Sequence, residues 1–148
     1  MAIYSTAAFQ TPVSSSYKTM LEMLGGTGGR LKVFEMIWSC SGTPADNALV
    51  NDVIRITATG TGTAVTPTPL DPADVAAAAA CEEDSTAEPT TTGIALLEIP
   101  VNQRATVRWV AREGSELVVA ATANFGFAFR VKHGSYTAQS EVNVLHQE

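Results

Sequence analysis

The stretch "RLKVFEMIWS" (residues 30–39) decides the fold class, because it alternates with a period of two. Successive side chains of a β-strand point to opposite faces of its sheet. The pattern places Leu31, Val33 and Ile37 on one face and Phe34, Met36 and Trp38 on the other. Because both faces are apolar, we predict a strand that is central in a sandwich or is partly buried by another subunit. Phe34, Met36 and Trp38 are therefore candidate interface residues.

Glu35 interrupts the first of these faces. We interpret it as an edge or interface carboxylate paired with an arginine, in preference to an acid catalyst.

A second stretch, "VIRITATGTGTAV" (53–65), predicts one long strand. One face carries Arg55 and four threonines, and the other tapers from isoleucine to glycine. Threonine suits the pleat of a sheet, whereas glycine in a strand marks a bulge, a bend or the close approach of another backbone. We therefore expect the half with Gly60 and Gly62 to lie against another segment, and both glycines are candidate interface positions.

The residues that follow predict an extended crossing and then a short helix. The prolines of Thr66–Pro69 cannot donate to a central ladder. Asp71 is a suitable N-cap and Pro72 suits the first helical position, so an alanine-rich helix is expected over Val75–Cys81. The acids between Glu82 and Glu88 are interpreted as a solvated loop, in preference to a calcium site, because they lack the ligand spacing of an EF-hand.

Residues 1–29 are expected to form an N-terminal arm or short helix, separate from a β-sandwich domain over 30–148. Tyr17, Met20, Leu21 and Leu24 recur at helical spacing, and Gly25 and Gly26 would end that helix. The segment "GGTGGR" (25–30) lacks the Lys-Ser/Thr of a phosphate-binding loop.

The second half of the chain predicts a run of short strands separated by turns, which is typical of a sandwich or barrel. These strands are expected near residues 93–99, 104–111, 116–122, 125–131 and 139–146. In the second of them, Arg104 and Arg108 would share a face. Such an exposed pair suits contact with an acidic neighbour, which makes both arginines candidate interface residues, although a solvated sheet face is the preferred interpretation. Phe125, Phe127 and Phe129 would form a core stripe.

The composition limits the classes of function. The net charge is −6, which opposes binding to a phosphate backbone, so no direct nucleic-acid partner is expected. Charged residues are only 16% of the chain, against about 25% in ordinary soluble domains. We find no signal peptide or membrane span in the sequence and expect a soluble protein made in a cytoplasm. The two cysteines, Cys40 and Cys81, are interpreted as ordinary small apolar residues.

Catalytic and metal-binding patterns are absent from the sequence. His133 and His146 are its two histidines, and neither belongs to a nucleophile or zinc motif. We therefore predict no enzymatic activity and no cofactor.

Four segments of the sequence resemble a family of small structural proteins of tailed bacteriophages, the capsid decoration or cement proteins. They are "SGTPADNALVNDVIRITATGTGTAVTPTPLDPADVAAAAA" (41–80), "TAEPT" (86–90), "IPVNQRATVRWVAREGSELVVAATANFGFAFRV" (99–131) and "SYTAQSEVNVLHQE" (135–148). The resemblance implies a homotrimeric sandwich or jelly roll that is made in the bacterial cytoplasm. It also implies a place on the outer surface of the head, where the protein binds the major capsid protein. It supplies no site motif.

Together these observations predict an all-β fold, a β-sandwich or jelly roll with one or two short helices and an N-terminal arm. The expected function is a virion structural protein. The alternative is a β-sandwich recognition module, either associated with a phage tail or binding glycans.

Overall fold

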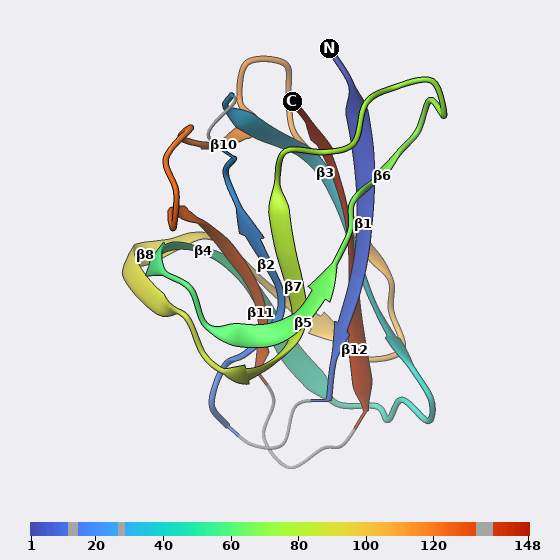
Figure 1. Ribbon diagram of the computed structural model, residues 1–148. Helices are drawn as coiled ribbons and strands as arrows, with labels where there is room; N and C mark the ends of the chain where they lie inside the picture. The colour runs from blue at the N-terminus through green and yellow to red at the C-terminus, as the bar shows by residue number, and fades with distance from the viewer. Residues whose placement is uncertain (12–14, 27–28, 133–137) are drawn as a thin grey trace.

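Twelve β-strands carry the fold in the computed structural model, which describes residues 1–11, 15–26, 29–132 and 138–148 (Figure 1). No helix occurs among these residues, and so none that could span a membrane. The strands are β1 (Ile3–Gln10), β2 (Lys18–Leu24), β3 (Leu31–Ser41), β4 (Ala48–Ala58), β5 (Thr61–Val65), β6 (Thr68–Pro69), β7 (Ala80–Ala87), β8 (Thr90–Asn102), β9 (Val107–Val110), β10 (Leu117–Val119), β11 (Gly126–Lys132) and β12 (Gln139–Gln147).

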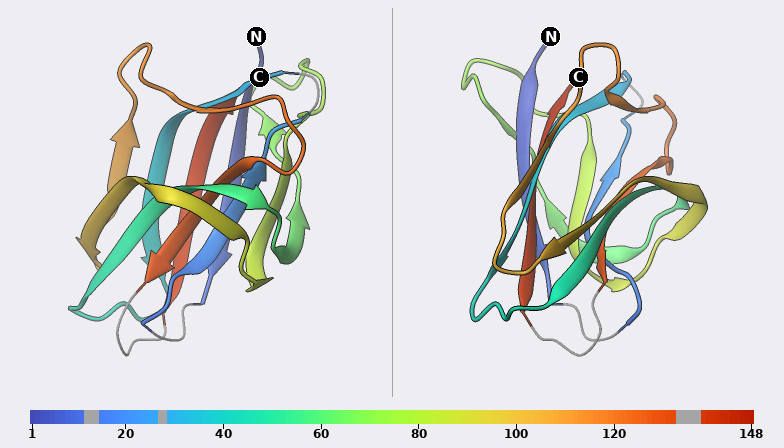
Figure 2. Two further views of the ribbon diagram at one scale, coloured as in Figure 1. Left: turned by 90° about the vertical axis from the view of Figure 1, so that its left-hand side faces the viewer. Right: turned by 180° about the vertical axis from the view of Figure 1, so that it is seen from behind.

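The strands form two antiparallel sheets packed face to face, which confirms the predicted β-sandwich (Figures 1 and 2). In the first sheet the order is β10-β3-β12-β1-β6, and β9 also pairs with β3. In the second sheet the order is β5-β7-β2-β11-β4-β8. The strands expected in the second half of the chain are all present.

The core lies between the two sheets and is built mainly from alternate residues of the strands, whereas β2 and β11 are buried along consecutive residues. It includes Trp38, Met20, Leu21, Met23, Val33, Met36, Phe127, Phe129, Val131, Val142 and Val144. Phe127 and Phe129 are fully buried and their ring centroids lie 6.4 Å apart, whereas Phe125 at the start of the predicted stripe is 46% exposed. Burial of such side chains contributes about 1.5–3 kcal/mol each, which makes this core the main stabilising feature of the sandwich.

A β-bulge in β3 changes which of its side chains face the core. Glu35 pairs with Leu145 and Val33 pairs with His146, so Phe34 is an extra residue opposite the β12 ladder. The bulge shifts the alternation by one residue. As a result Leu31, Val33, Met36 and Trp38 are all buried. The predicted division of this strand into two apolar faces is therefore wrong, because strict alternation does not hold across Phe34.

Residues 1–29 do not form the predicted arm or helix over their described part. Strand β1 lies between β12 and β6 in the first sheet, and β2 lies between β7 and β11 in the second. Met20, Leu21 and Met23 of β2 are completely buried. Ladder pairing on both sides and burial of both faces override the weak helical spacing in this segment.

The predicted long strand over 53–65 is divided at Thr59 and Gly60 into β4 and β5. Ala58 at the end of β4 pairs with Thr90 of β8, and Thr61 at the start of β5 pairs with Ala87 of β7. The segments β4–β5 and β7–β8 thus run as one long antiparallel ribbon. The ribbon curls back across β2 and β11, as the foremost strands in the left view of Figure 2 show. The bend occurs where the predicted glycine face begins.

Gly60 and Gly62 allow the close backbone approach that the sequence predicts. A Cβ atom at Gly60 would lie 2.3 Å from the carbonyl oxygen of Ala87, and one at Gly62 would lie 2.6 Å from that of Glu83. Both contacts are with backbone carbonyls of strand β7, within the same chain. The need for glycine at these positions is therefore explained without a second subunit.

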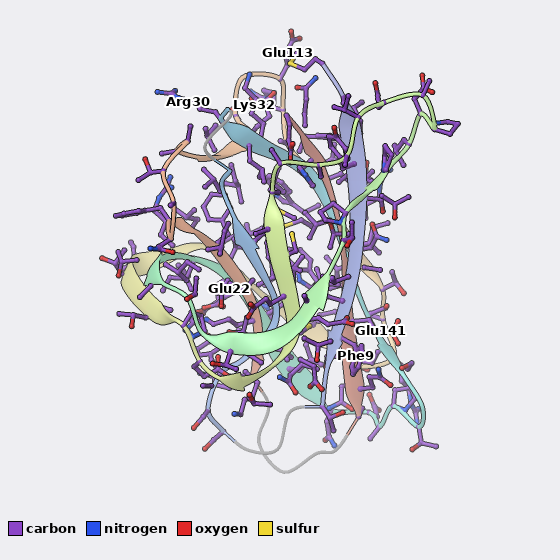
Figure 3. The ribbon with its side chains drawn as sticks, in the orientation of Figure 1. Phe9, Glu22, Arg30, Lys32, Glu113 and Glu141 are labelled. Atoms are coloured by element: carbon purple, nitrogen blue, oxygen red, sulfur yellow. The ribbon has the colours of Figure 1, made fainter. Side chains whose placement is uncertain are left out.

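Glu22 is buried beneath the bend of this ribbon (Figure 3). Its Oε2 accepts a hydrogen bond from the backbone N–H of Gly60 at 2.9 Å, and its Oε1 has no partner among the described residues. Burial raises the pKa of the Glu22 carboxyl against the lowering effect of the Gly60 hydrogen bond, and the nearby Glu82 and Glu88 raise it further. The bend thus favours the protonated carboxyl.

The helix predicted over Val75–Cys81 is absent, and strand β7 begins at Ala80. The Asp71 side chain binds the following backbone, as an N-cap would, but it stabilises a turn and not a helix. Its Oδ1 accepts a hydrogen bond from the N–H of Ala73 at 2.9 Å. The Tyr4 hydroxyl then donates to the carbonyl of Val75, and the Glu148 carboxylate accepts from the N–H groups of Ala78 and Ala79. Because these backbone groups bind distant side chains, they do not form the hydrogen bonds of a helix.

The acids between Glu82 and Glu88 lie on and just after β7, and the predicted solvated loop is therefore wrong. Glu82 accepts a hydrogen bond from the N–H of Gly62 at 2.9 Å. Glu88 accepts from the N–H and hydroxyl of Thr19 and lies 3.6 Å from the Lys18 ammonium. These acids therefore connect the ribbon to its neighbouring strands.

Replacing Trp38 tests the core position that the bulge gives it. We expect Trp38→Ala to lower the free energy of unfolding in urea by about 3–5 kcal/mol, because it leaves a cavity between the sheets. Val75→Ala, at a side chain that is 76% exposed, is the control and should change stability by less than about 0.5 kcal/mol. A comparably small loss for Trp38→Ala would contradict the buried position.

The Glu22 carboxyl predicts a distinct pH dependence of stability. Its folded-state pKa lies above the unfolded value of about 4.3, so its contribution is complete below that pH and is lost as pH rises through the folded-state pKa. Glutamine can still accept from Gly60 but cannot ionise. The stability advantage of Glu22→Gln over wild type should therefore be absent near pH 4 and grow toward pH 8. Glu113→Gln makes the same substitution in an exposed loop and is the matched control. Parallel profiles for wild type and Glu22→Gln would refute the interpretation.

Candidate interaction surface

The side of the first sheet that points away from the core forms a broad face, which we call the outer face. It carries the half-buried or exposed residues that alternate with the core positions of β1, β3, β9 and β12. Its members are Ile3, Ser5, Ala7, Phe9, Lys32, Phe34, Glu35, Ile37, Ser39, Ser41, Arg108, Val110, Gln139, Glu141, Asn143, Leu145 and Gln147. Aliphatic, small and uncharged polar side chains therefore make up most of this face.

Glu35 and Arg108 neutralise each other on the outer face. The Arg108 Nε donates to Glu35 Oε1 at 2.6 Å and its Nη2 donates to Oε2 at 3.0 Å, a bidentate pair between neighbouring strands. The hydrogen bonds from Arg108 lower the pKa of the Glu35 carboxyl, and the same bonds raise the pKa of Arg108. The predicted pairing of Glu35 with an arginine is confirmed, and Arg108 finds its acidic neighbour within the chain.

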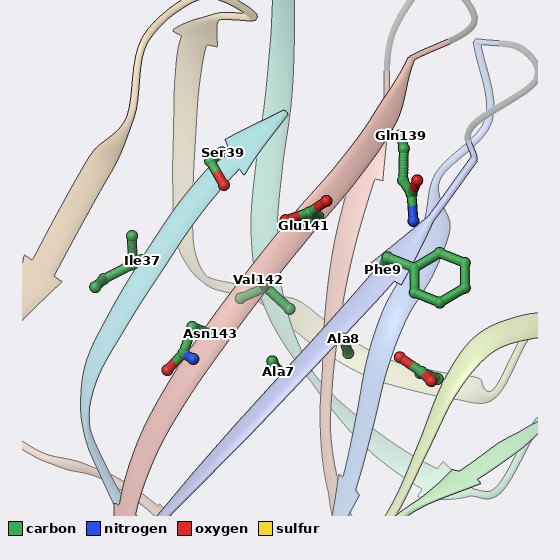
Figure 4. A pocket seen from close by; sticks show the side chains of 10 residues that line it. Ala7, Ala8, Phe9, Ile37, Ser39, Gln139, Glu141, Val142 and Asn143 are labelled. Carbon is green, nitrogen blue, oxygen red and sulfur yellow. The ribbon is translucent and has the colours of Figure 1, made fainter. Parts of the chain in front are cut away.

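A groove crosses the outer face over β1, β12 and β3 (Figure 4). Its volume is about 320 Å³. Ala7 leaves the space open because its side chain is only a methyl group, and Phe9 and Ile37 provide larger apolar surfaces beside it. Glu141 of β12 and Glu83 of β7 contribute carboxylates to the lining, and the remaining polar side chains are Ser39, Gln139 and Asn143. The groove thus combines an apolar floor with an acidic rim.

A second group of charged side chains lies on the other sheet, where it joins β4, β8 and β11. Arg130 donates its Nε to Asp52 Oδ1 at 2.9 Å, and its guanidinium lies over the ring of Tyr17. The Tyr17 hydroxyl donates to Glu98. Burial and this hydrogen bond raise the pKa of Tyr17 to about 12. These groups bind one another, so the arrangement connects strands and holds Tyr17 in its neutral form.

The side chains of Cys40, Cys81 and His146 pack against other residues of the fold. Cys81 is buried, and burial raises the pKa of its thiol to about 12, so it remains a thiol at neutral pH. Cys40 is half-buried, and its sulfur lies 3.7 Å from the Ser140 hydroxyl. His146 stacks on Tyr4 with ring centroids 5.4 Å apart, and burial lowers its pKa even though Glu148 lies beside it. His133 lies outside the described residues.

The structure separates the residues that the sequence grouped as a candidate interface. Phe34 and Arg108 do lie on the outer face. Met36 and Trp38 are buried in the core, so their side chains are not available to a partner. Gly60 and Gly62 lie in the ribbon.

Arg104 does not share a strand with Arg108, as predicted, because β9 begins only at Val107. It occupies the preceding turn, where its Nε donates to the carbonyl of Pro44 at 3.3 Å.

Sequence reasoning missed the groove because it assigned β1 to an arm. The alternation that identifies β1 is present in "IYSTAAFQ" (3–10), but two of its buried positions are the polar residues Thr6 and Gln10. Gln10 compensates for its burial by donating to the carbonyls of Thr19 and Ser85, which lie on or next to other strands of the fold. The pairing of Phe9 with Glu141 in neighbouring strands was equally invisible without the register.

Within the described ranges, no three histidine, cysteine or acidic side chains are placed to hold a metal ion. Comparison with protein-family models, with curated proteins and with solved structures gave no match to the chain.

Proposed function

We propose that the protein is a structural subunit of a tailed-phage virion, a decoration protein that binds the outside of the capsid as a homotrimer. The observation that carries this proposal is the character of the outer face. It is a continuous sheet surface on which apolar and uncharged polar side chains alternate, and two of its few charges, Glu35 and Arg108, neutralise each other. Depletion of charge at the centre of a surface is characteristic of protein interfaces.

Extensive strand pairing holds the outer face in place. β3 and β12 pair along nearly their whole length, and β1 pairs with β12 over its full length. These ladders join strands that are distant in sequence. The shape of the outer face therefore depends on the complete fold and not on one local segment. A partner docked on it would contact a preformed surface and would not have to order a loop.

The phage assignment itself rests on the sequence resemblance of residues 41–80, 86–90, 99–131 and 135–148. The net charge of −6 supports the outer side of the shell over the DNA-filled interior, since the protein would repel the phosphate backbone. Under this proposal the protein has no catalytic role, and its partners are its own copies and the major capsid protein.

The proposed homotrimer predicts a mass in solution. Light scattering after size exclusion, at micromolar concentration, should give three times the mass of the 15.5 kDa chain. A stable monomer would contradict the trimer and, together with binding on a glycan array, would favour the recognition module instead.

Leu145→Glu tests whether the outer face binds the shell. Leu145 is half-buried and lies beside Glu35 on the neighbouring strand, so a second carboxylate there would be desolvated on docking. We expect the variant to remain folded by circular dichroism. In co-sedimentation with heads of the encoding phage that lack the protein, it should bind at least about tenfold more weakly than wild type, or about 1.4 kcal/mol.

Val75→Glu adds the same charge at an exposed side chain outside the outer face and is the matched control. Equal binding of both variants to the heads would argue against the outer face as the docking surface.

A further inference from the structure

The two carboxylates that line the groove have no cationic partner within the described part of the chain, in contrast to several other acids of the fold. Glu35 pairs with Arg108, Asp52 with Arg130 and Glu88 with Lys18. Glu141 and Glu83 line the groove, and neither forms an ion pair or a side-chain hydrogen bond within the described part of the chain. They come from different sheets, so the fold brings together two charges that the sequence keeps far apart.

The rest of the lining favours a long cationic side chain over a small cation. Ala7, Phe9 and Ile37 form an apolar surface beside the carboxylates (Figure 4). Lysine and arginine bury an aliphatic stem against such surfaces while the charged head stays near water or a carboxylate. An arginine can in addition stack on an aromatic ring such as that of Phe9. A hydrated metal ion would gain nothing from these apolar walls.

The shape of the groove indicates how that side chain would be presented. The groove lies across three adjacent strands and is open to solvent, with Gln139, Ser39 and Asn143 at its sides. These side chains can donate to and accept from the backbone of an extended segment. Anionic partners such as nucleic acid or an acidic membrane would be repelled by Glu141 and Glu83.

We propose that the groove binds a lysine or arginine side chain carried on an extended segment of the shell protein. The identity of the partner rests on the proposed function. The preference for a lysine or arginine side chain rests on charge complementarity between the unpaired carboxylates of the groove and a basic group. A second copy of this chain fits less well, because each copy carries a net charge of −6.

The groove chemistry is tested by titrating the labelled full chain with a short acetylated and amidated peptide of threonine and valine with one central arginine. In two-dimensional amide NMR spectra, we expect shifts concentrated at Ala7, Phe9, Ile37 and Asn143. The matched peptide with glutamine in place of arginine should bind at least about fivefold more weakly. Absence of shifts at millimolar peptide, equal binding of both peptides, or shifts on the second sheet would each overturn the inference.

Two variants locate the binding. Glu141→Gln removes one carboxylate, and Ala7→Trp fills the groove from an exposed position. Both should weaken binding of the arginine peptide by about fivefold or more. Glu113→Gln removes the same charge at the far end of the molecule (Figure 3) and should bind as wild type does. If Glu141→Gln and Glu113→Gln behave alike, general charge attraction explains the binding and the inference fails.

Co-sedimentation with the same heads separates this inference from the proposed function. If wild type binds heads while Glu141→Gln and Ala7→Trp bind them equally well, the groove inference is wrong and the decoration function stands. If wild type binds the arginine peptide but no heads, the shell protein is excluded as partner and the decoration function fails. Weakened head binding by both groove variants, with Glu113→Gln unaffected, supports both.

Discussion

The extra residue at Phe34 is the constraint on which the outer face depends. β3 pairs with β12, β9 and β10, so its alternation determines both surfaces of the first sheet. With the bulge, Met36 and Trp38 join Leu31 and Val33 in the core. The same shift turns Glu35 and Ile37 outward, where Glu35 meets Arg108 and Ile37 lines the groove. A bulge of this kind is a local change with a consequence for every residue that follows it in the strand.

The second sheet differs from the first in that its outer side is partly covered. Its ribbon curls over β2 and β11 and buries a small cluster of Ile54, Ile56 and Ala128 together with the Glu22 carboxyl. The free edge strand β8 carries Pro100, which cannot donate to a further strand. The second sheet therefore covers much of its own outer side, whereas the first sheet leaves its outer side open.

The sequence predicted the fold class and most strands because their alternation is strong. Residues 125–131 and 139–146 read clearly as strands, and the Gly60 and Gly62 pattern predicted close backbone approach. The bulge at Phe34 could not be predicted, since a single extra residue leaves no trace in an alternating apolar stretch. Nor could the groove, because Glu83 and Glu141 line the same groove only through the packing of the two sheets. The Asp71 cap signal was correct locally, but Tyr4 and Glu148 bind the backbone that would have formed the helix.

We propose that the open side of the first sheet is the surface through which the protein binds a capsid shell. Hydrogen exchange of the head-bound and free protein, read by mass spectrometry, tests it most directly. We expect slower exchange on binding in peptides that cover β1 and β12, which carry the groove, and little change in those that cover β8 and the β4–β5 bend. Protection confined to the second sheet, or no protection of β1 and β12 in bound protein, would contradict the claim.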